Sequence, residues 1–161
     1  MICCPIVRPC CEMNLKTFLS TLGRGWKLFA AAEYCHRQCR KSESNPQRSH
    51  GGDGGPAIDA SLVEPSGIVE TKTGIVYISD WSSHVIRKVV RATGVITTIA
   101  GTPGESGTLG DGGLAVDAML NSPGGLHFDE ETGALYIAEY GSHRIRMIDS
   151  EGKISTVAGN G

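Results

Sequence analysis

The chain has 161 residues, enough for one ordinary domain, and 22 of them are glycine. Residues 1–50 carry eight Lys/Arg and three Asp/Glu, a balance of +5, whereas residues 51–161 carry seven and fourteen, a balance of −7. The acidic part repels phosphate backbones, which argues against a nucleic-acid partner, and no apolar run approaches the length of a membrane span.

Residues 1–47 are an unclassified N-terminal segment that contains all six cysteines, Cys3, Cys4, Cys10, Cys11, Cys35 and Cys39. Apolar residues recur at helical spacing from Leu15 to Leu22, so a helix within residues 14–39 is one interpretation. A poorly ordered segment, or one that is not native to the fold, is the alternative. Prolines and charges interrupt the first dozen residues, which is a poor pattern for a signal peptide.

Cys35, His36 and Cys39 raise the question of a metal site. A structural zinc ion takes four ligands in a tetrahedron, but this spacing matches no close C-x-x-C pair. We therefore interpret the cysteines as reduced or incidental thiols, and we predict no metal and no cofactor. Residues 51–161 contain no cysteine, so their fold does not depend on disulfides, and cysteine usage does not decide the compartment.

The rest of the chain is organised around a Gly-Asp-Gly-Gly motif at residues 52–55, which returns at residues 110–113. Other residues return in the same order: Ala57, Ala60, Leu62, Pro65 and Gly67 as Ala115, Ala118, Leu120, Pro123 and Gly125. A fixed period of this length is the signature of a repeat architecture. We therefore divide the chain into a first repeat with its Gly-rich linker, residues 48–109, and a second repeat, residues 110–161.

Each repeat predicts the same series of short elements. Pro56 is well placed to start a single helical turn, because proline is favoured at the first helical position. A turn at residues 65–67 follows, and then strands over residues 67–70, 75–80, 84–90 and 95–100. The second repeat predicts strands over residues 125–129, 134–139, 143–149 and 153–158. Each repeat is thus a four-stranded meander, and no long helix is expected after residue 65.

An isolated meander exposes two faces and two edges, whereas radial stacking of such sheets builds a β-propeller. We therefore predict an all-β fold, a partial β-propeller of two four-stranded antiparallel blades, preceded by the non-repeat segment. Two blades cover one internal face and leave two outer faces bare. Those faces carry apolar residues such as Ile78, Ile86, Ile137 and Ile145, some of which should bury against a neighbour. This predicts that the chain does not close a ring by itself, and that it is either marginally stable or self-associates.

Each repeat carries a characteristic set of strand motifs. They are Tyr-Ile-Ser-Asp at 77–80 with Ser-His-Val-Ile-Arg-Lys-Val at 83–89, Tyr-Ile-Ala-Glu at 136–139 with Ser-His-Arg-Ile-Arg at 142–146, and the strand ends at 96–101 and 154–159. Over residues 50–161 these motifs resemble the NHL-repeat family, which implies membership of a closed ring of about six blades. WD40 repeats are a weaker match, because no Gly-His and Trp-Asp pair marks the blade ends. The sequence departs from the family at Glu139, where Asp is usual, and at Trp81 and Tyr140, where a small residue is usual.

Repeated polar residues are the candidate sites. His84 and His143 precede the third strand of each repeat, and no nucleophile with a supporting carboxylate recurs beside them. We predict structural histidines that form hydrogen bonds between neighbouring strands. Asp53 and Asp111 stand alone among glycines, without the further oxygen ligands of a calcium loop or the lysine of a phosphate-binding loop, so we predict a turn-forming role.

Two arginines also repeat, and we predict that Arg87 and Arg146 pair with Asp80 and Glu139 across the preceding turn. Such a pair contributes little to stability where it is exposed. No catalytic residue and no metal ligand is assigned, and no particular residue is assigned to binding.

These observations predict a non-enzymatic protein-interaction module of NHL-repeat type, which presents the loops of a β-propeller to a protein partner. One alternative is a fragment of a propeller-type enzyme, such as a metal-dependent lyase, which a convergent His/Glu set near the axis would indicate. Another is a truncated gene product without independent function, which further Gly-Asp-Gly-Gly repeats in the adjoining genomic sequence would indicate.

Overall fold

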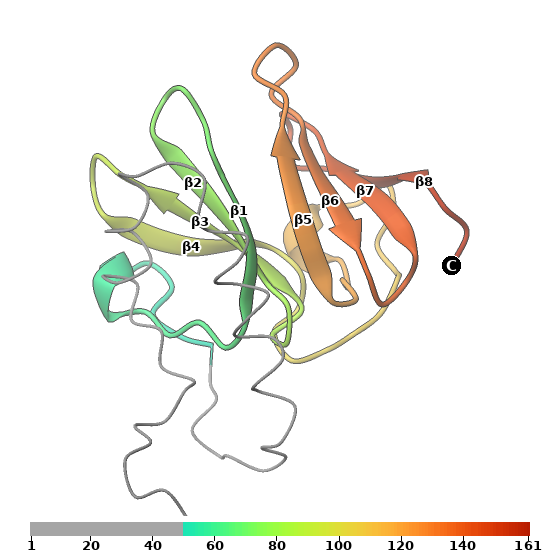
Figure 1. The fold of residues 1–161 in the computed structure, drawn as a ribbon, viewed down its shortest axis with the longest axis horizontal. Helices are drawn as coiled ribbons and strands as arrows, with labels where there is room; N and C mark the ends of the chain where they lie inside the picture. The colour runs from blue at the N-terminus through green and yellow to red at the C-terminus, as the bar shows by residue number, and fades with distance from the viewer. Residues whose placement is uncertain (1–49) are drawn as a thin grey trace, which may run out of the picture.

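The computed structural model describes residues 50–161, so the predictions for residues 1–47, including the helix and the thiols, lie outside the described residues. The described chain forms two four-stranded antiparallel sheets that stand side by side (Figure 1). Strand order follows chain order in both sheets, β1-β2-β3-β4 and β5-β6-β7-β8. These are the two predicted propeller blades, here called blade 1 and blade 2.

Both blades have the same elements. Blade 1 contains the 3-10 helix η2 (Ala57–Asp59) and the strands β1 (Pro65–Glu70), β2 (Ile75–Asp80), β3 (Val85–Val90) and β4 (Val95–Ala100). Blade 2 contains η3 (Ala115–Asp117), β5 (Pro123–Phe128), β6 (Leu135–Glu139), β7 (Arg144–Ile148) and β8 (Ile154–Ala158). The β-branched and aromatic residues of these strands favour extended backbone, and the hairpin turn at Gly74 uses a φ of 80° that glycine adopts at little cost.

Several strand boundaries differ from the prediction by one or two residues, and two of the differences have a clear backbone cause. The residues predicted as a turn at 65–67 are the start of β1, and the pairing with β2 shifts register between Pro65 and Gly67. This shift is a β-bulge, which bends the strand while pairing continues on both sides. His84, predicted as the first residue of a strand, has a φ of 58°, so β3 begins at Val85.

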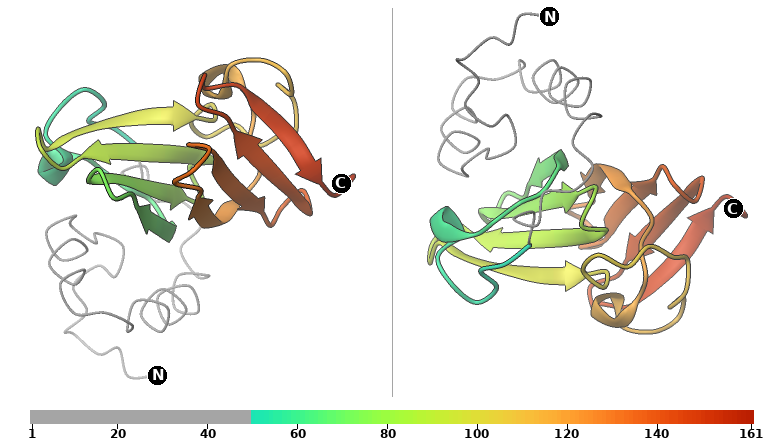
Figure 2. Two further views of the ribbon diagram at one scale, coloured as in Figure 1. Left: turned by 90° about the horizontal axis from the view of Figure 1, so that it is seen from above. Right: turned by 90° about the horizontal axis from the view of Figure 1, so that it is seen from below.

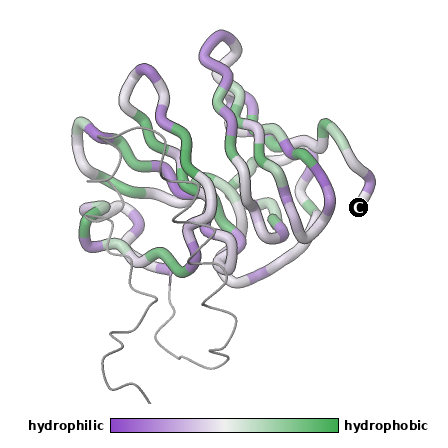
Figure 3. Tube along the Cα trace, in the orientation of Figure 1, coloured by the Kyte–Doolittle hydropathy of each residue, from purple (hydrophilic) through white to green (hydrophobic). Residues whose placement is uncertain are grey.

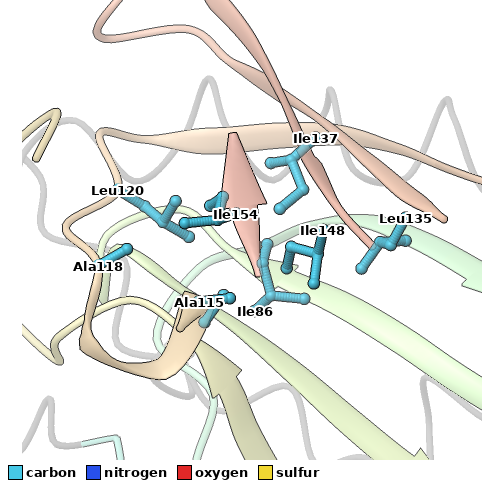
Figure 4. Packing of buried hydrophobic residues seen from close by; sticks show 9 residues of the cluster. Ile86, Ala115, Ala118, Leu120, Leu135, Ile137, Ile148 and Ile154 are labelled. Carbon is cyan, nitrogen blue, oxygen red and sulfur yellow. The ribbon is translucent and has the colours of Figure 1, made fainter. Parts of the chain in front are cut away.

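Hydrophobic residues concentrate within the strands and hydrophilic residues at the outer loop tips (Figure 3). Blade 1 buries a cluster of its own, made of Ala57, Val76, Ile78, Val89 and Ile96. The second cluster combines residues of blade 2 with two residues of blade 1, Ile86 and Ala100 (Figure 4). The core of blade 2 therefore extends across the junction between the blades.

The backbones of the two blades approach closely at one glycine of this junction. A Cβ atom on Gly67 would lie 2.2 Å from the carbonyl oxygen of Gly124, a distance that real Cβ atoms do not adopt. The hydroxyl groups of Ser79 and Ser66 donate hydrogen bonds of 2.6 and 3.0 Å to the carbonyl oxygens of Gly124 and Pro123. A small residue in β1 thus allows the first strand of blade 2 to lie directly against blade 1.

Blade 1 lies at one side of the molecule, and blade 2 lies at the other side. Figure 2 shows β8 at the edge of blade 2 that lies farthest from blade 1, with the last residue of the chain beside it. One side of blade 2 is therefore covered by blade 1, and the other side is turned away from it.

Replacing Gly67 with Ala should lower the free energy of unfolding by about 1–3 kcal/mol, because the added methyl group forces the two backbones apart. Gly51→Ala is the matched control, since a Cβ atom there would meet nothing within 4 Å. Chemical denaturation of the two variants measures the difference. Equal stabilities for Gly67→Ala and Gly51→Ala would contradict the close approach.

Candidate interaction surface

The Gly-Asp-Gly-Gly loop of blade 1 is tied to its own sheet by a buried arginine. The guanidinium of Arg87 is fully buried and lies 2.6 Å from the Oδ1 atom of Asp53. It also donates hydrogen bonds to the carbonyl oxygens of Gly51 at 3.1 Å and Ser61 at 3.3 Å. The second oxygen of Asp53 accepts the backbone N–H of Thr98 at 2.9 Å. This group of contacts, here called the Arg–Asp strut, attaches the loop to strands β3 and β4.

Blade 2 repeats the Arg–Asp strut. The guanidinium of Arg146 is fully buried and lies 2.6 Å from Asp111, whose other oxygen accepts the backbone N–H of Thr156 at 3.1 Å. Arg146 also donates to the carbonyl oxygen of Met119 at 3.5 Å. The aspartates do lie in turns, as predicted, but each is also the ionic partner of an arginine more than thirty residues away.

The predicted pairing of the arginines is therefore wrong in blade 1 and incomplete in blade 2. Asp80 accepts the backbone N–H groups of Val63 and Glu64 at 2.9 and 2.8 Å and the hydroxyl of Ser83 at 2.9 Å. Glu139 is the second partner of Arg146, at 3.5 Å. Both guanidinium groups are fully buried, so the small contribution expected of an exposed pair does not apply to them.

The pKa is lowered for two of these carboxyl groups and raised for a third. Burial alone would raise the pKa of Asp53, but hydrogen bonds from Thr98 and the charge of Arg87 outweigh it and lower the pKa. The pKa of Asp111 is lowered in the same way by Thr156 and Arg146. Burial raises the pKa of Glu139, against the opposing hydrogen bond from Ser142 and the charge of Arg146. The two aspartates are held as anions by the struts, which is a structural role.

The two repeated histidines occupy different environments. The Nδ1 atom of His84 accepts the backbone N–H of Ser122 at 3.0 Å, which links the turn after β2 to the residue before β5. Burial lowers the pKa of His84, against the opposing charge of Asp80, and so favours the neutral ring that accepts this bond. His143 is exposed, and its ring packs near Tyr140 with centroids 6.4 Å apart. Among the residues described, His143 has no neighbouring blade to bond to.

Two aromatic side chains lie together at the end of the blades where the β2–β3 and β6–β7 turns gather. Trp81 follows β2 and Tyr140 follows β6, and their ring centroids are 5.0 Å apart. Trp81 also lies over Gly124 across the junction, at 3.7 Å from a Cβ atom built there. The Tyr140 side chain is 70% exposed. We call Trp81, Tyr140 and the adjacent His143 the aromatic ledge.

A hollow of about 450 Å³ opens beside the aromatic ledge on the side of blade 2 that faces away from blade 1. The ledge residues line its rim, and glycine, alanine and isoleucine line most of the rest, including Gly125, Ala138, Ile145 and Ala158. Glu139 and Arg144 are the charged residues of the lining. The arrangement offers an apolar surface with an aromatic rim.

The aromatic ledge is the feature that reasoning from single residues missed. Its signal in the sequence was the placement of Trp81 and Tyr140 at equivalent positions where small residues are usual. Within residues 50–161 no group of three or more His, Cys, Asp or Glu side chains is placed to hold a metal ion. The same residues contain no helix long and apolar enough to cross a membrane.

Comparison with known proteins agrees with this architecture. The family model of the Teneurin NHL domain matches residues 36–106 and again residues 100–161. The chain belongs to the NHL-repeat family. The NHL assignment therefore rests on both repeats, as does the resemblance of their strand motifs.

Several relatives share the NHL repeats over part of their length. NHL repeat-containing protein 2 from Bos taurus is 35% identical over 104 residues, which is 64% of this chain and 14% of the relative. Teneurin-3 from Mus musculus is 31% identical over 103 residues, 57% of this chain and 4% of the relative. The chain thus spans a small fraction of the curated proteins that it matches.

Solved structures with the same arrangement of sheets also cover this chain in part. A protein of unknown function from Bacteroides thetaiotaomicron superposes with a TM-score of 0.56 at 27% identity, covering 63% of this chain and 24% of that one. An auxiliary nutrient binding protein from the same organism gives a TM-score of 0.51 at 25% identity, covering 72% of this chain and 28% of that one. The NHL repeats here thus correspond to about a quarter of each larger protein.

The Arg–Asp struts predict how stability depends on pH. The pKa values of Asp53 and Asp111 are lower in the folded chain than the ordinary 3.8, so their contribution is present above that pH and is lost as the pH falls through the folded values. We expect the melting temperature of the double variant Asp53→Asn, Asp111→Asn to lie below that of the wild type at pH 7. The gap should narrow as the pH falls below about 4. Thermal melts at a series of pH values measure it, and a gap independent of pH would contradict the strut.

The different environments of the histidines predict different effects of substitution. His84→Ala leaves the Ser122 N–H without its acceptor, which should cost about 1–3 kcal/mol of stability. His143→Ala is the matched control, because His143 has a similar positive φ but is exposed. We expect a clear fall in melting temperature for the first variant and a small change for the second. A larger effect at His143 would show that another part of the chain covers it.

Proposed function

We propose that the chain is a non-enzymatic protein-interaction module of NHL-repeat type, and that the aromatic ledge is its principal contact surface. The observation that carries the proposal is the pair of aromatic rings, Trp81 and Tyr140, placed side by side by two equivalent turns. We retain residues 1–47, 48–109 and 110–161 as the division of the chain. The proposed contact surface lies at the junction of the second and third of these parts.

The physical properties of the ledge support this role. Aromatic residues offer large contact area at low cost in conformational entropy, and they are enriched among the residues that dominate binding energy at protein interfaces. Tyr140 is 70% exposed, whereas tyrosine is on average a residue of intermediate burial. The aromatic rings of the ledge can therefore contact the surface of a partner directly.

Hydrogen bonds within the turns hold the ledge residues in place, and such preorganisation favours binding because less order is lost on association. In blade 1 the hydroxyl of Ser83 donates to the carboxylate of Asp80 at 2.9 Å, which closes the turn around Trp81. In blade 2 the hydroxyl of Ser142 donates to Glu139 in the same way around Tyr140. Equivalent hydrogen bonds therefore hold both aromatic residues in place before any partner arrives.

The partner that suits this surface is a protein with an exposed apolar segment. The repeat region is acidic overall, which disfavours nucleic acid and favours partners without strong negative charge. The lining of the hollow is mostly apolar, and its buried acid Glu139 is already bonded to Ser142 and close to Arg146. No arrangement in residues 50–161 specifically favours the alternative of a propeller-type enzyme.

The test is a comparison of variants in partner binding. The immobilised chain is used to capture proteins from cells, and each captured protein is then produced alone and titrated calorimetrically. Tyr140→Ser and Trp81→Ser should each lower the affinity for a directly binding partner by about tenfold or more. This is the effect expected at a residue that dominates an interface. Val116→Ser is the control, because Val116 is also exposed but lies on η3, away from the ledge.

Two results would overturn the proposal. One is a partner whose affinity is unchanged by both ledge substitutions, which would place the contact surface elsewhere. The other is the absence of any protein that binds the purified chain directly. Circular dichroism of each variant confirms that a lost affinity does not come from a lost fold.

A further inference from the structure

The side of blade 2 that faces away from blade 1 repeats, residue by residue, a side of blade 1 that is covered. We call the surface of Ile86, Ala100 and Gly101 in blade 1, and of Ile145, Ala158 and Gly159 in blade 2, the trailing face of each blade. Ile86 and Ala100 are 0% exposed, and Gly101 is also buried. Ile145 is 36% exposed, and Ala158 and Gly159 are exposed. The trailing face of blade 2 therefore has the same backbone and a similar apolar surface, without its cover.

The cover on blade 1 is made by the connecting segment of blade 2 together with residues of its sheet, Leu135, Ile137, Ile148 and Ile154. Ile86 and Ala100 pack in one cluster with Ala115, Ala118 and Leu120, which come from η3 and the residues after it (Figure 4). The backbone N–H of Gly101 donates to the carbonyl oxygen of Ala115 at 3.0 Å. We call the surface of Ala115, Ala118 and Leu120, and its counterpart Ala57, Ala60 and Leu62 in blade 1, the leading face of each blade.

The leading face of blade 1 is built like the one that already docks; Ala57 is buried like Ala115, but the other two residues are less buried than their counterparts. Ala118 and Leu120 are 0% exposed, whereas Ala60 and Leu62 are partly exposed. The Ala57 carbonyl oxygen accepts the N–H of Ala60 at 3.3 Å, as the Ala115 oxygen accepts that of Ala118 at 3.2 Å. It can therefore accept a further bond as Ala115 does. The chain carries both halves of the same contact, one at each end of the described pair of blades.

We propose that the chain assembles head to tail, with the trailing face of blade 2 covered by the leading face of blade 1 of a second copy. In this contact Ile145 and Ala158 pack against Ala60 and Leu62 of the second copy, and the N–H of Gly159 donates to its Ala57 carbonyl oxygen. The two surfaces differ from each other, so the contact is heterologous and repeats until the ring closes. Three copies of the described pair of blades would supply the six blades that the family resemblance implies.

The contact between copies lacks some polar interactions of the internal junction. Ser66 and Ser79, whose hydroxyl groups bond across that junction, correspond to Gly124 and Ala138 in blade 2. Arg144 replaces the buried Val85 and donates instead to the carbonyl oxygen of Asn160 at 3.1 Å. The assembly therefore depends on apolar packing and one backbone hydrogen bond, which predicts association that weakens on dilution.

Two substitutions block the two faces separately. Ile145→Glu places a charge on the trailing face of blade 2, and Leu62→Glu places one on the leading face of blade 1. Light scattering coupled to size exclusion should give several copies for the wild type and monomers for each variant alone. An equimolar mixture of the variants should give a dimer and nothing larger, because one intact face remains on each partner. Leu109→Glu, at a residue 70% exposed and outside both faces, should assemble like the wild type.

A second measurement does not need the Leu62 variant to fold. Ile145→Glu retains its leading face, so adding it to the wild type should end growing assemblies and reduce the average mass in proportion to its share. A wild-type chain that stays monomeric at every concentration would overturn the proposal, and would show that another segment or partner covers the faces. Assembly of Ile145→Glu equal to the wild type, or a mixture of two folded variants that stays monomeric, would overturn it as well.

Discussion

The burial of Ile86 and Ala100 of blade 1 in the core of blade 2 is the contact on which the described structure depends. A four-stranded meander has two faces, and one sheet cannot bury both within itself. Full burial of an isoleucine side chain contributes about 1.5–3 kcal/mol, so each such contact matters in a domain of this size. The neighbour is therefore part of the fold of each blade, and the surface of blade 2 that faces away from blade 1 is where this requirement remains unmet among the described residues.

The Arg–Asp struts explain how the covering surface is made. Part of the surface that covers a neighbouring blade comes from a connecting loop with a single turn of helix, which has little structure of its own. Arg87 and Arg146 bond to these loops through an aspartate and through backbone carbonyl oxygens. Each buried guanidinium is thereby paired, and the loop is fixed on the sheet. The Gly-Asp-Gly-Gly motif thus serves packing between blades, because it holds the leading face in position.

Local patterning was enough to predict the strands, the two meanders and the pair of blades. β2 and β4 have the predicted boundaries, because alternation and turn residues mark both ends of these strands. The errors occurred where backbone or long-range geometry decides the outcome. No pattern of residue types marks the bulge after Pro65 or the positive φ of His84. The pairing of Arg87 with Asp53 joins residues that are 34 positions apart in the sequence. Nearness in sequence suggested Asp80, which the backbone N–H groups of Val63 and Glu64 occupy instead.

The candidate surface was harder to predict than the fold, because its residues come together only across the junction. Trp81 and Tyr140 were visible as unusual residues at equivalent positions, but their contact depends on the angle between the blades. That angle is set by the close approach of Gly67 to Gly124 and by the hydrogen bonds of Ser66 and Ser79. The second repeat has glycine and alanine where the first has these serines. Divergence between the repeats therefore strengthens one junction through polar contacts, and leaves at the other end a surface that offers mainly apolar packing.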